Sequence, residues 1–69
     1  MNVYYEVRAP ITGVLIQDSG CEDVHLQSGA VFTLTRVPLP NSYIVEARWD
    51  GKLLRLLVDD FMANCDWLA

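Results

Sequence analysis

Hydrophobic and polar residues alternate most regularly along residues 43–58, on both sides of Asp50 and Gly51. An Asp-Gly pair between two strand-like runs predicts a β-hairpin with a type I′ turn, because both turn residues need a positive φ. This turn places Trp49 opposite Lys52, and the rest of the register follows. Side chains alternate between the two faces of a strand, so one face is predicted to be core. That face consists of Tyr43, Val45, Ala47, Leu54, Leu56 and Val58.

The other face of the predicted hairpin mixes charged and aliphatic side chains. In the same register Glu46 lies opposite Arg55, which is a favourable cross-strand charge pair. Three large aliphatic residues, Ile44, Leu53 and Leu57, point to the side where solvent is expected. Two interpretations follow: a neighbouring segment, residues 8–13, folds over them, or they form an interface with another protein molecule.

The rest of the chain is also strand-like. Alternation or β-branched composition predicts extended segments at residues 3–8, 12–17, 24–27 and 30–37. Residues 18–23 are polar and turn-rich, so they are expected to form a loop.

The periodicity changes after residue 58. Asp59 is predicted to cap a helical turn over residues 59–64, in which Phe61 or Met62 closes one end of the core. Residues 65–69 then return as a last short strand beside the first.

These elements predict one all-β domain over residues 1–69. We expect a small SH3-like barrel of five to six short antiparallel strands, with one short helical turn near the C-terminus, because closure removes exposed edges. A small open β-sheet with a helix is the alternative.

Composition restricts the class of partner. The chain has 69 residues, 52% of them hydrophobic, and a formal net charge of −4. So short a chain buries little of its surface, and such domains often depend on a disulfide, a metal or oligomerisation. Its acidic character counts against binding to nucleic acid or to anionic lipid. Part of the apolar surface is therefore expected to contact protein.

The expected localisation and redox state follow from the lack of a membrane span and of a secretory signal in the sequence. No apolar run approaches the roughly 20 residues that cross a bilayer, and the first residues lack the features of a secretory signal. We expect a cytoplasmic protein, with no membrane contact, in which Cys21 and Cys65 are free thiols. Neither cysteine has a second Cys or His at metal-ligand spacing, so no metal and no cofactor are predicted.

A resemblance to known proteins is carried by residues 26–64. They contain Leu-x-Ser-Gly-Ala-Val, then Tyr-Ile-Val-Glu-Ala-Arg-Trp-Asp-Gly-Lys, and finally Val-Asp-Asp-Phe. This pattern resembles small bacterial SH3-like barrel proteins, most of them uncharacterised, and the compact acidic chain is similar to products of mobile gene cassettes. The resemblance implies an architecture and not a reaction.

Type II dihydrofolate reductases resemble the chain at the level of the fold only. They are small SH3-like barrels that form tetramers around a central pore, and their active site rests on a Val-Gln-Ile-Tyr run. Leu53, Leu54, Arg55 and Leu56 stand at the matching positions here. The Gln and Tyr of that family are absent, so the resemblance does not carry the activity.

No catalytic constellation is visible. His25 is the only histidine, and no Ser or Cys is placed by sequence to use it as a base. Adjacent acids such as Glu22 and Asp23 point to opposite sides of an extended chain. The aromatic residues are expected in the core or at its rim, with a groove for proline-rich or methylated peptides as the alternative.

The sequence therefore predicts a non-enzymatic protein-interaction module that self-associates through the outer face of the 43–58 hairpin, or binds another protein. The candidate interface residues are Ile44, Arg48, Trp49, Leu53, Arg55 and Leu57. The alternatives are an oligomer with a shared ligand-binding or enzymatic pocket, and a protein that binds or mimics nucleic acid.

Overall fold

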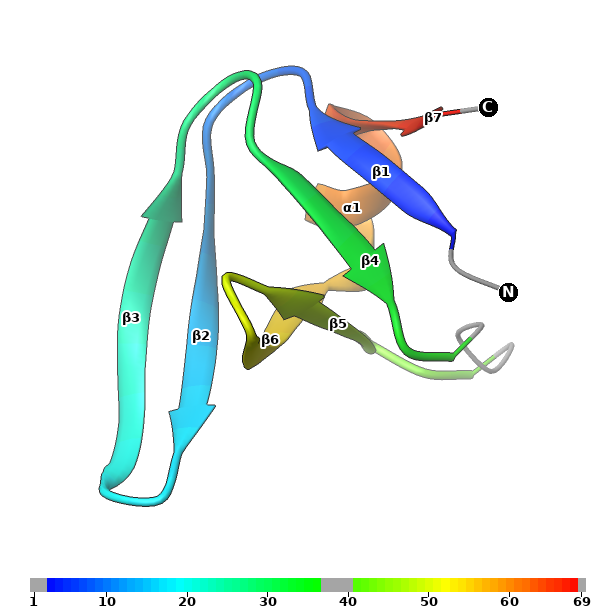
Figure 1. Cartoon of the computed structure of the whole chain (residues 1–69). Helices are drawn as coiled ribbons and strands as arrows, with labels where there is room; N and C mark the ends of the chain where they lie inside the picture. The colour runs from blue at the N-terminus through cyan, green and yellow to red at the C-terminus, as the bar shows by residue number, and fades with distance from the viewer. Residues whose placement is uncertain (1–2, 37–40, 69) are drawn as a thin grey trace.

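A computed structural model describes residues 3–36 and 41–68 of the chain. This part contains seven strands and one helix (Figure 1). In chain order they are β1 (Tyr4–Val7), β2 (Ile11–Gln17), β3 (Gly20–Leu26), β4 (Val31–Leu34), β5 (Ile44–Trp49), β6 (Lys52–Leu57), α1 (Val58–Asn64) and β7 (Cys65–Leu68).

All seven strands belong to one antiparallel sheet, in the order β3-β2-β6-β5-β4-β1-β7. The prediction of an all-β fold with a short C-terminal helical segment is confirmed, with seven strands instead of five or six. The prediction of a closed barrel is wrong, because β3 and β7 do not pair with each other. The sheet curls around a core and stays open.

The sheet stays open because β2 pairs with its two neighbours, β3 and β6, over different lengths. β2 pairs with β3 along seven residues but with β6 only at Val14, Leu15 and Ile16. The β2–β3 hairpin therefore projects from the rest of the domain as an arm, and Figure 1 shows this arm on the side away from β7. This arm carries β3 away from the other end of the sheet.

The central hairpin has the predicted register. Trp49 pairs with Lys52, and the turn residues Asp50 and Gly51 have φ values of 53° and 73°. Those positive values are typical of a type I′ turn. The register also brings Val45 opposite Leu56 in the core, where both are at most 1% exposed.

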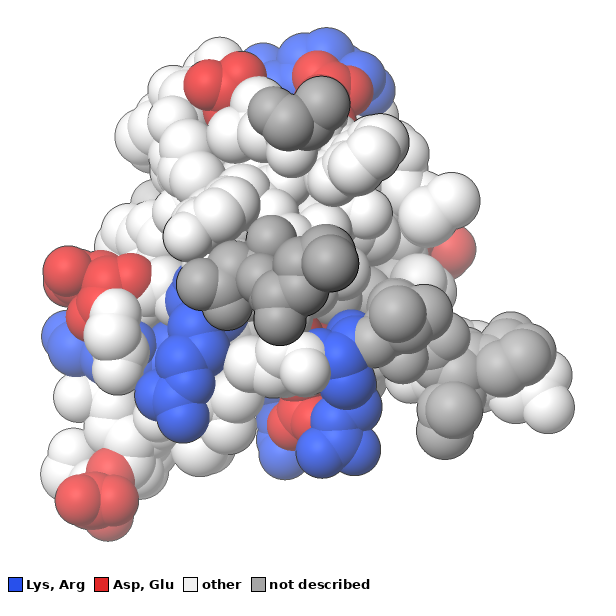
Figure 2. Space-filling view, turned by 45° about the vertical axis from the view of Figure 1, so that its right-hand side comes forward, with Lys and Arg blue, Asp and Glu red and all other residues white. Residues whose placement is uncertain are grey.

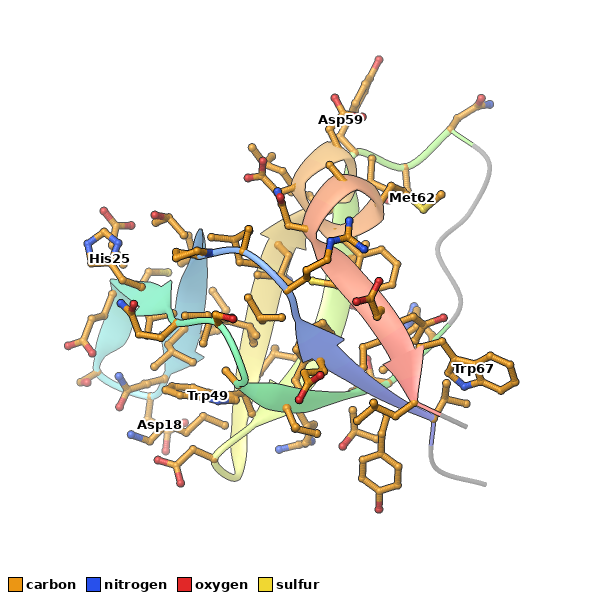
Figure 3. All side chains as sticks on the ribbon, turned by 90° about the horizontal axis from the view of Figure 1, so that it is seen from above. Asp18, His25, Trp49, Asp59, Met62 and Trp67 are labelled. Carbon is orange, nitrogen blue, oxygen red and sulfur yellow. The ribbon has the colours of Figure 1, made fainter. Side chains whose placement is uncertain are left out.

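The core lies on the concave side of the sheet, and α1 covers part of it. Phe61 of α1 is buried, and its ring centroid lies 4.8 Å from that of Tyr5 on β1. Among the described residues, ten hydrophobic ones are buried: Val7, Ile11, Leu15, Leu26, Phe32, Val45, Ala47, Leu54, Leu56 and Phe61. Phe61 is therefore the helical residue that closes the core, and Met62 points away from it, 73% exposed (Figure 3).

Tyr43 does not enter the core as predicted, and its side chain is 81% exposed. Its carbonyl still accepts a hydrogen bond from the Val58 N–H, so the backbone keeps the register. The Ser42 hydroxyl, however, forms hydrogen bonds with the N–H and the carbonyl of Ile44. Because of this local turn, β5 begins only at Ile44. Tyr43 thus lies beyond the end of the sheet.

Residues 18–23 are not a loop. Only Asp18 and Ser19 form the turn, and β3 begins at Gly20. Asp59 is not the helix cap either, because β6 continues directly into α1 and the N-cap residue is Leu57, with no side-chain cap hydrogen bond. Asp59 and Asp60 lie in the first turn, where their negative charges interact favourably with the positive end of the helix dipole.

Strand lengths also differ from prediction at two places. The strand predicted for residues 30–37 is shorter, since β4 ends at Leu34, and residue 37 lies outside the described residues. The predicted last strand is β7, which pairs with β1 as expected, and residue 69 lies outside the described residues.

Gly13 is required where β2 approaches β6. A Cβ atom at this position would lie 2.6 Å from Leu56 Cδ2 and 3.1 Å from the Arg55 carbonyl oxygen. Gly13→Ala is therefore expected to lower the free energy of unfolding by about 1–3 kcal/mol, as overpacking does in well-packed cores. Urea denaturation measures the change, with Thr12→Ala at the exposed neighbouring position as the control. Equal stability of the two variants would contradict this packing argument.

Candidate functional site

The outer side of the sheet carries a continuous set of aliphatic side chains on β2, β6 and β5. We call it the outer apolar surface, and it consists of Val14, Ile16, Ile44, Leu53 and Leu57. Leu57 is 54% exposed and Ile44 is 39% exposed, while the other three are half-buried. The surface is thus open to solvent in the single chain.

Strand pairing creates this surface. Ile44 lies opposite Leu57 across β5 and β6, as predicted from the sequence. On the other side of β6, Ile16 of β2 lies opposite Leu53, and Val14 lies one pair further along. Side chains of directly opposed residues lie on the same face of a sheet, so β2 extends the hairpin's aliphatic row by two residues.

A shallow groove of about 530 Å³ runs along the outer apolar surface. Its lining includes Val14, Ile16, Ile44 and Leu57, and Gly13 forms part of it where β2 and β6 diverge. Polar groups stand among them: Arg55 and Asp60 also contact the groove. A long apolar depression with few charges suits an apolar side chain of a partner better than a polar small molecule.

Charged groups beside the groove are arranged unevenly. Glu46 forms ion pairs with Arg55 on β6, at 3.4 Å, and with Arg36, at 3.5 Å. Within the described residues, neither Arg48 nor Lys52 forms an ion pair. Figure 2 shows most of the visible basic side chains on the lower part of one face, with acidic ones beside them.

This distribution differs from the acidic average of the chain. Arg36 and residues 43–58 contain four of the five basic residues and two of the nine acidic ones, a net of +2. The rest of the chain has one basic and seven acidic residues, a net of −6, which together give −4. The outer side of the central hairpin is therefore the least acidic part of the protein.

The structure brings together five of the six predicted interface residues. Ile44, Leu53 and Leu57 belong to the outer apolar surface, and Arg48 and Arg55 lie on the same side of the sheet. The sixth, Trp49, is half-buried and packs against the core on the side of Ala47. Strand alternation is the reason, since odd-numbered residues of β5 face inward.

Sequence reasoning missed Val14 and Ile16. The signal was available in residues 11–17, because Ile11, Gly13 and Leu15 are buried and alternate with the two outward residues. Without the pairing of β2 to β6, however, nothing placed that strand next to the hairpin. One of the two interpretations had residues 8–13 fold over this surface, but Ile44 and Leu57 remain exposed.

A second cavity, of about 450 Å³, has a lining of mixed polar and apolar groups near one end of β2 and β3. His25 lies at its edge, with an exposed ring whose Nδ1 is 3.0 Å from the Thr12 hydroxyl (Figure 3). Asp60 and Asn64 of α1 also line this cavity. Over residues 3–36 and 41–68, no group of three or more His, Cys, Asp or Glu side chains is placed to hold a metal ion.

Both cysteines are free thiols and lie on the two end strands of the sheet, Cys21 on β3 and Cys65 on β7. Cys21 is exposed and lines the groove. The pKa of the Cys65 thiol is raised from 9.0 to about 11, mainly by burial and also by the neighbouring Asp66 carboxylate, against the opposing effect of Arg8. Cys65 is therefore a neutral thiol at physiological pH.

Comparisons with known proteins found no matching protein family, no matching characterised protein and no matching solved structure. In the described residues, no helix combines the length and the apolar character needed to span a membrane. The function of the chain has to be argued from its own surface.

The two thiols are expected to differ in reactivity. At pH 8, iodoacetamide should modify Cys21 at least about tenfold faster than Cys65, because alkylation requires an accessible thiolate. Mass spectrometry of quenched time points measures both rates in one sample. Variants Cys21→Ser and Cys65→Ser assign the two rates, and equal rates would contradict the placement of Cys65.

The raised pKa of Cys65 also predicts a pH dependence of stability. The thiol ionises near 9 in the unfolded chain and near 11 in the folded one. Its contribution to stability is therefore complete below pH 9 and is lost as the pH rises towards 11. Between these values the free energy of unfolding should fall more steeply for the wild type than for Cys65→Val, as measured by denaturant titrations. Parallel curves would show that the thiol does not contribute.

Proposed function

We propose that the protein is a non-enzymatic protein-interaction module that self-associates through the outer apolar surface. The observation that carries this proposal is the exposure of Ile44 and Leu57 beside an apolar groove. Burial of apolar surface is favourable by about 25 cal/mol per Å². A contact that covers two large aliphatic side chains and the groove would therefore supply a substantial driving force.

The size of the chain supports a second copy as the partner. The chain has 69 residues, and the part that the structure describes has a core of ten buried hydrophobic residues; small domains of this kind often gain stability by association. The outer apolar surface lies on the strands that also form the centre of the core. Association there would stabilise β6 and β5 on both faces.

Charged groups around the groove would set the orientation of the partner. Arg48 has no ion pair within the described part of the chain, and the partially screened pair of Arg55 with Glu46 lies beside the groove. Such groups contribute more to specificity and to the rate of encounter than to affinity. A partner with acidic groups next to apolar side chains would fit, and this acidic chain provides both.

The SH3-like architecture and the cytoplasmic location belong to the same proposal. The strand order, with a central hairpin followed by a short helix and a last strand beside β1, is compatible with an SH3-like fold that is not closed. An interaction role is common for small domains of this class, although a fold by itself does not define a function.

Leu57→Glu tests the proposal. A carboxylate at this position would have to be buried in the interface, so the variant should lose the contact through the outer apolar surface and form smaller assemblies than the wild type at the same concentration. It should also stay folded, because Leu57 is 54% exposed in the single chain. Sedimentation equilibrium gives the mass, and circular dichroism confirms the fold.

Val31→Glu is the matched control. Val31 is 44% exposed on the outer side of β4 and lies outside the outer apolar surface. This variant should associate like the wild type. A wild type that stays monomeric over the whole concentration range, or a Leu57→Glu variant that associates normally, would disprove the proposal. Loss of folding in Leu57→Glu would show that the residue supports the core.

A further inference from the structure

The two ends of the open sheet differ in how they are protected. Within residues 3–36 and 41–68, β3 pairs only with β2, and β7 pairs only with β1. An unpaired strand edge recruits another strand unless charge or proline blocks it. β3 carries the adjacent acids Glu22 and Asp23, which repel a further strand. The charged residue of β7, Asp66, is instead ion-paired with Arg8, at 2.5 Å.

The hydrogen bonds of β1 show which backbone groups of β7 point outward. The Arg8 N–H donates to the Asn64 carbonyl at 2.7 Å, so the even-numbered residues of β7 bond to β1. Alternate residues of an antiparallel strand direct their backbone groups to opposite sides. Cys65 and Trp67 therefore face the free edge. The Cys65 N–H already donates to the Phe61 carbonyl at the end of α1, which leaves Trp67 with both groups available.

The side chain of Trp67 lies at the open end of an aromatic row. Phe32 on β4 pairs with Tyr5 on β1, and Tyr5 pairs with Trp67 on β7. The ring centroids of Phe32 and Tyr5 are 6.1 Å apart. Trp67 continues the row but is 65% exposed, and Figure 3 shows its indole pointing away from the domain. A large apolar ring thus lies in water beside an unpaired strand edge.

We propose that β7 pairs with β7 of a second copy, in an antiparallel arrangement around a two-fold axis at Trp67. The two sheets then become one continuous sheet. This interface goes beyond the outer apolar surface, because β4 and β1 separate β7 from β5 in the sheet. The occupant is a second copy, since a two-fold contact closes on itself and uses the same edge of each chain.

The register follows by exclusion. In a two-fold antiparallel pair one residue faces its own copy. Asp66 in that place would bring two carboxylates directly opposite each other, which is unfavourable. Cys65 would need the N–H that α1 already uses. Leu68 at the centre would place the other three residues of β7 beyond the end of the second copy's β7.

Trp67 at the centre avoids these costs. Its N–H and carbonyl bond to the same groups of the second copy, and Asp66 lies opposite Leu68 of that copy. The aromatic row of one chain then meets the aromatic row of the other, with the two Trp67 side chains as direct cross-strand neighbours.

Trp67→Pro tests the pairing, because proline removes the outward N–H and the indole while the hydrogen bonds of the even-numbered residues to β1 stay intact. In the Leu57→Glu background, where the outer apolar surface no longer associates, the dissociation constant for self-association should rise about thirtyfold or more, from the loss of two backbone hydrogen bonds and one aromatic contact. Sedimentation equilibrium measures it. Met62→Ala, which shortens another exposed apolar side chain, is the control and should leave the constant unchanged.

A second measurement reads the register and needs no variant. In a mixture of isotope-labelled and unlabelled wild-type protein, an intermolecular NOE should connect Hα of Asp66 with Hα of Leu68, which become neighbours in a non-hydrogen-bonded pair. Absence of this NOE in an associated sample would overturn the proposal, even where Trp67→Pro fails to fold. A monomeric wild type would also overturn it.

The two proposed interfaces can be disproved independently of each other. If Leu57→Glu abolishes association while Trp67→Pro associates like the wild type, the outer apolar surface stands and the β7 pairing is disproved. The reverse result disproves the outer apolar surface and supports the β7 pairing.

Discussion

The register of the β5–β6 hairpin is the constraint on which the rest of the structure depends. The positive φ values of Asp50 and Gly51 allow a two-residue turn, and this turn decides which residues face each other. A shift by one residue would bring Arg55 and Glu46 into the core and expel Val45 and its neighbours. The same register determines both faces, so the buried core and the outer apolar surface have one cause.

Much of the fold could be predicted where the turn residues and the pattern of buried and exposed positions indicate the same element. The hairpin register, the strand nature of residues 12–17 and the return of the last strand beside β1 all follow from alternation and turn residues. Prediction failed where they disagree. β3 is exposed along almost its whole length and carries Glu22 and Asp23, so its residues look like a loop. Tyr43 has the right period for the core but lies beyond the end of the strand.

The candidate site was predictable only as far as one hairpin. Ile44, Leu53 and Leu57 follow from the register, whereas Val14 and Ile16 join them because β2 crosses over to β6, a long-range pairing that local sequence does not encode. Gly13 makes this crossing possible, since a side chain there would collide with Leu56. This pairing of β2 with β6 completes the groove. It also directs β3 away from β7, so the sheet stays open.

An apolar content of 52% in 69 residues explains why both features occur in one molecule. In the described part of the chain, the concave side of the small curled sheet holds ten buried side chains, and other large apolar groups lie on the outer side or at the edges. Three of them mark two places: Leu57 and Ile44 share a groove, and Trp67 continues an aromatic row from the core. Acidic residues lie on other parts of the surface, including the edge of β3, and both proposed contacts lie where the charge is low or already paired. A chain that cannot hide its apolar surface by closing a barrel can still hide it by contact with its own copies.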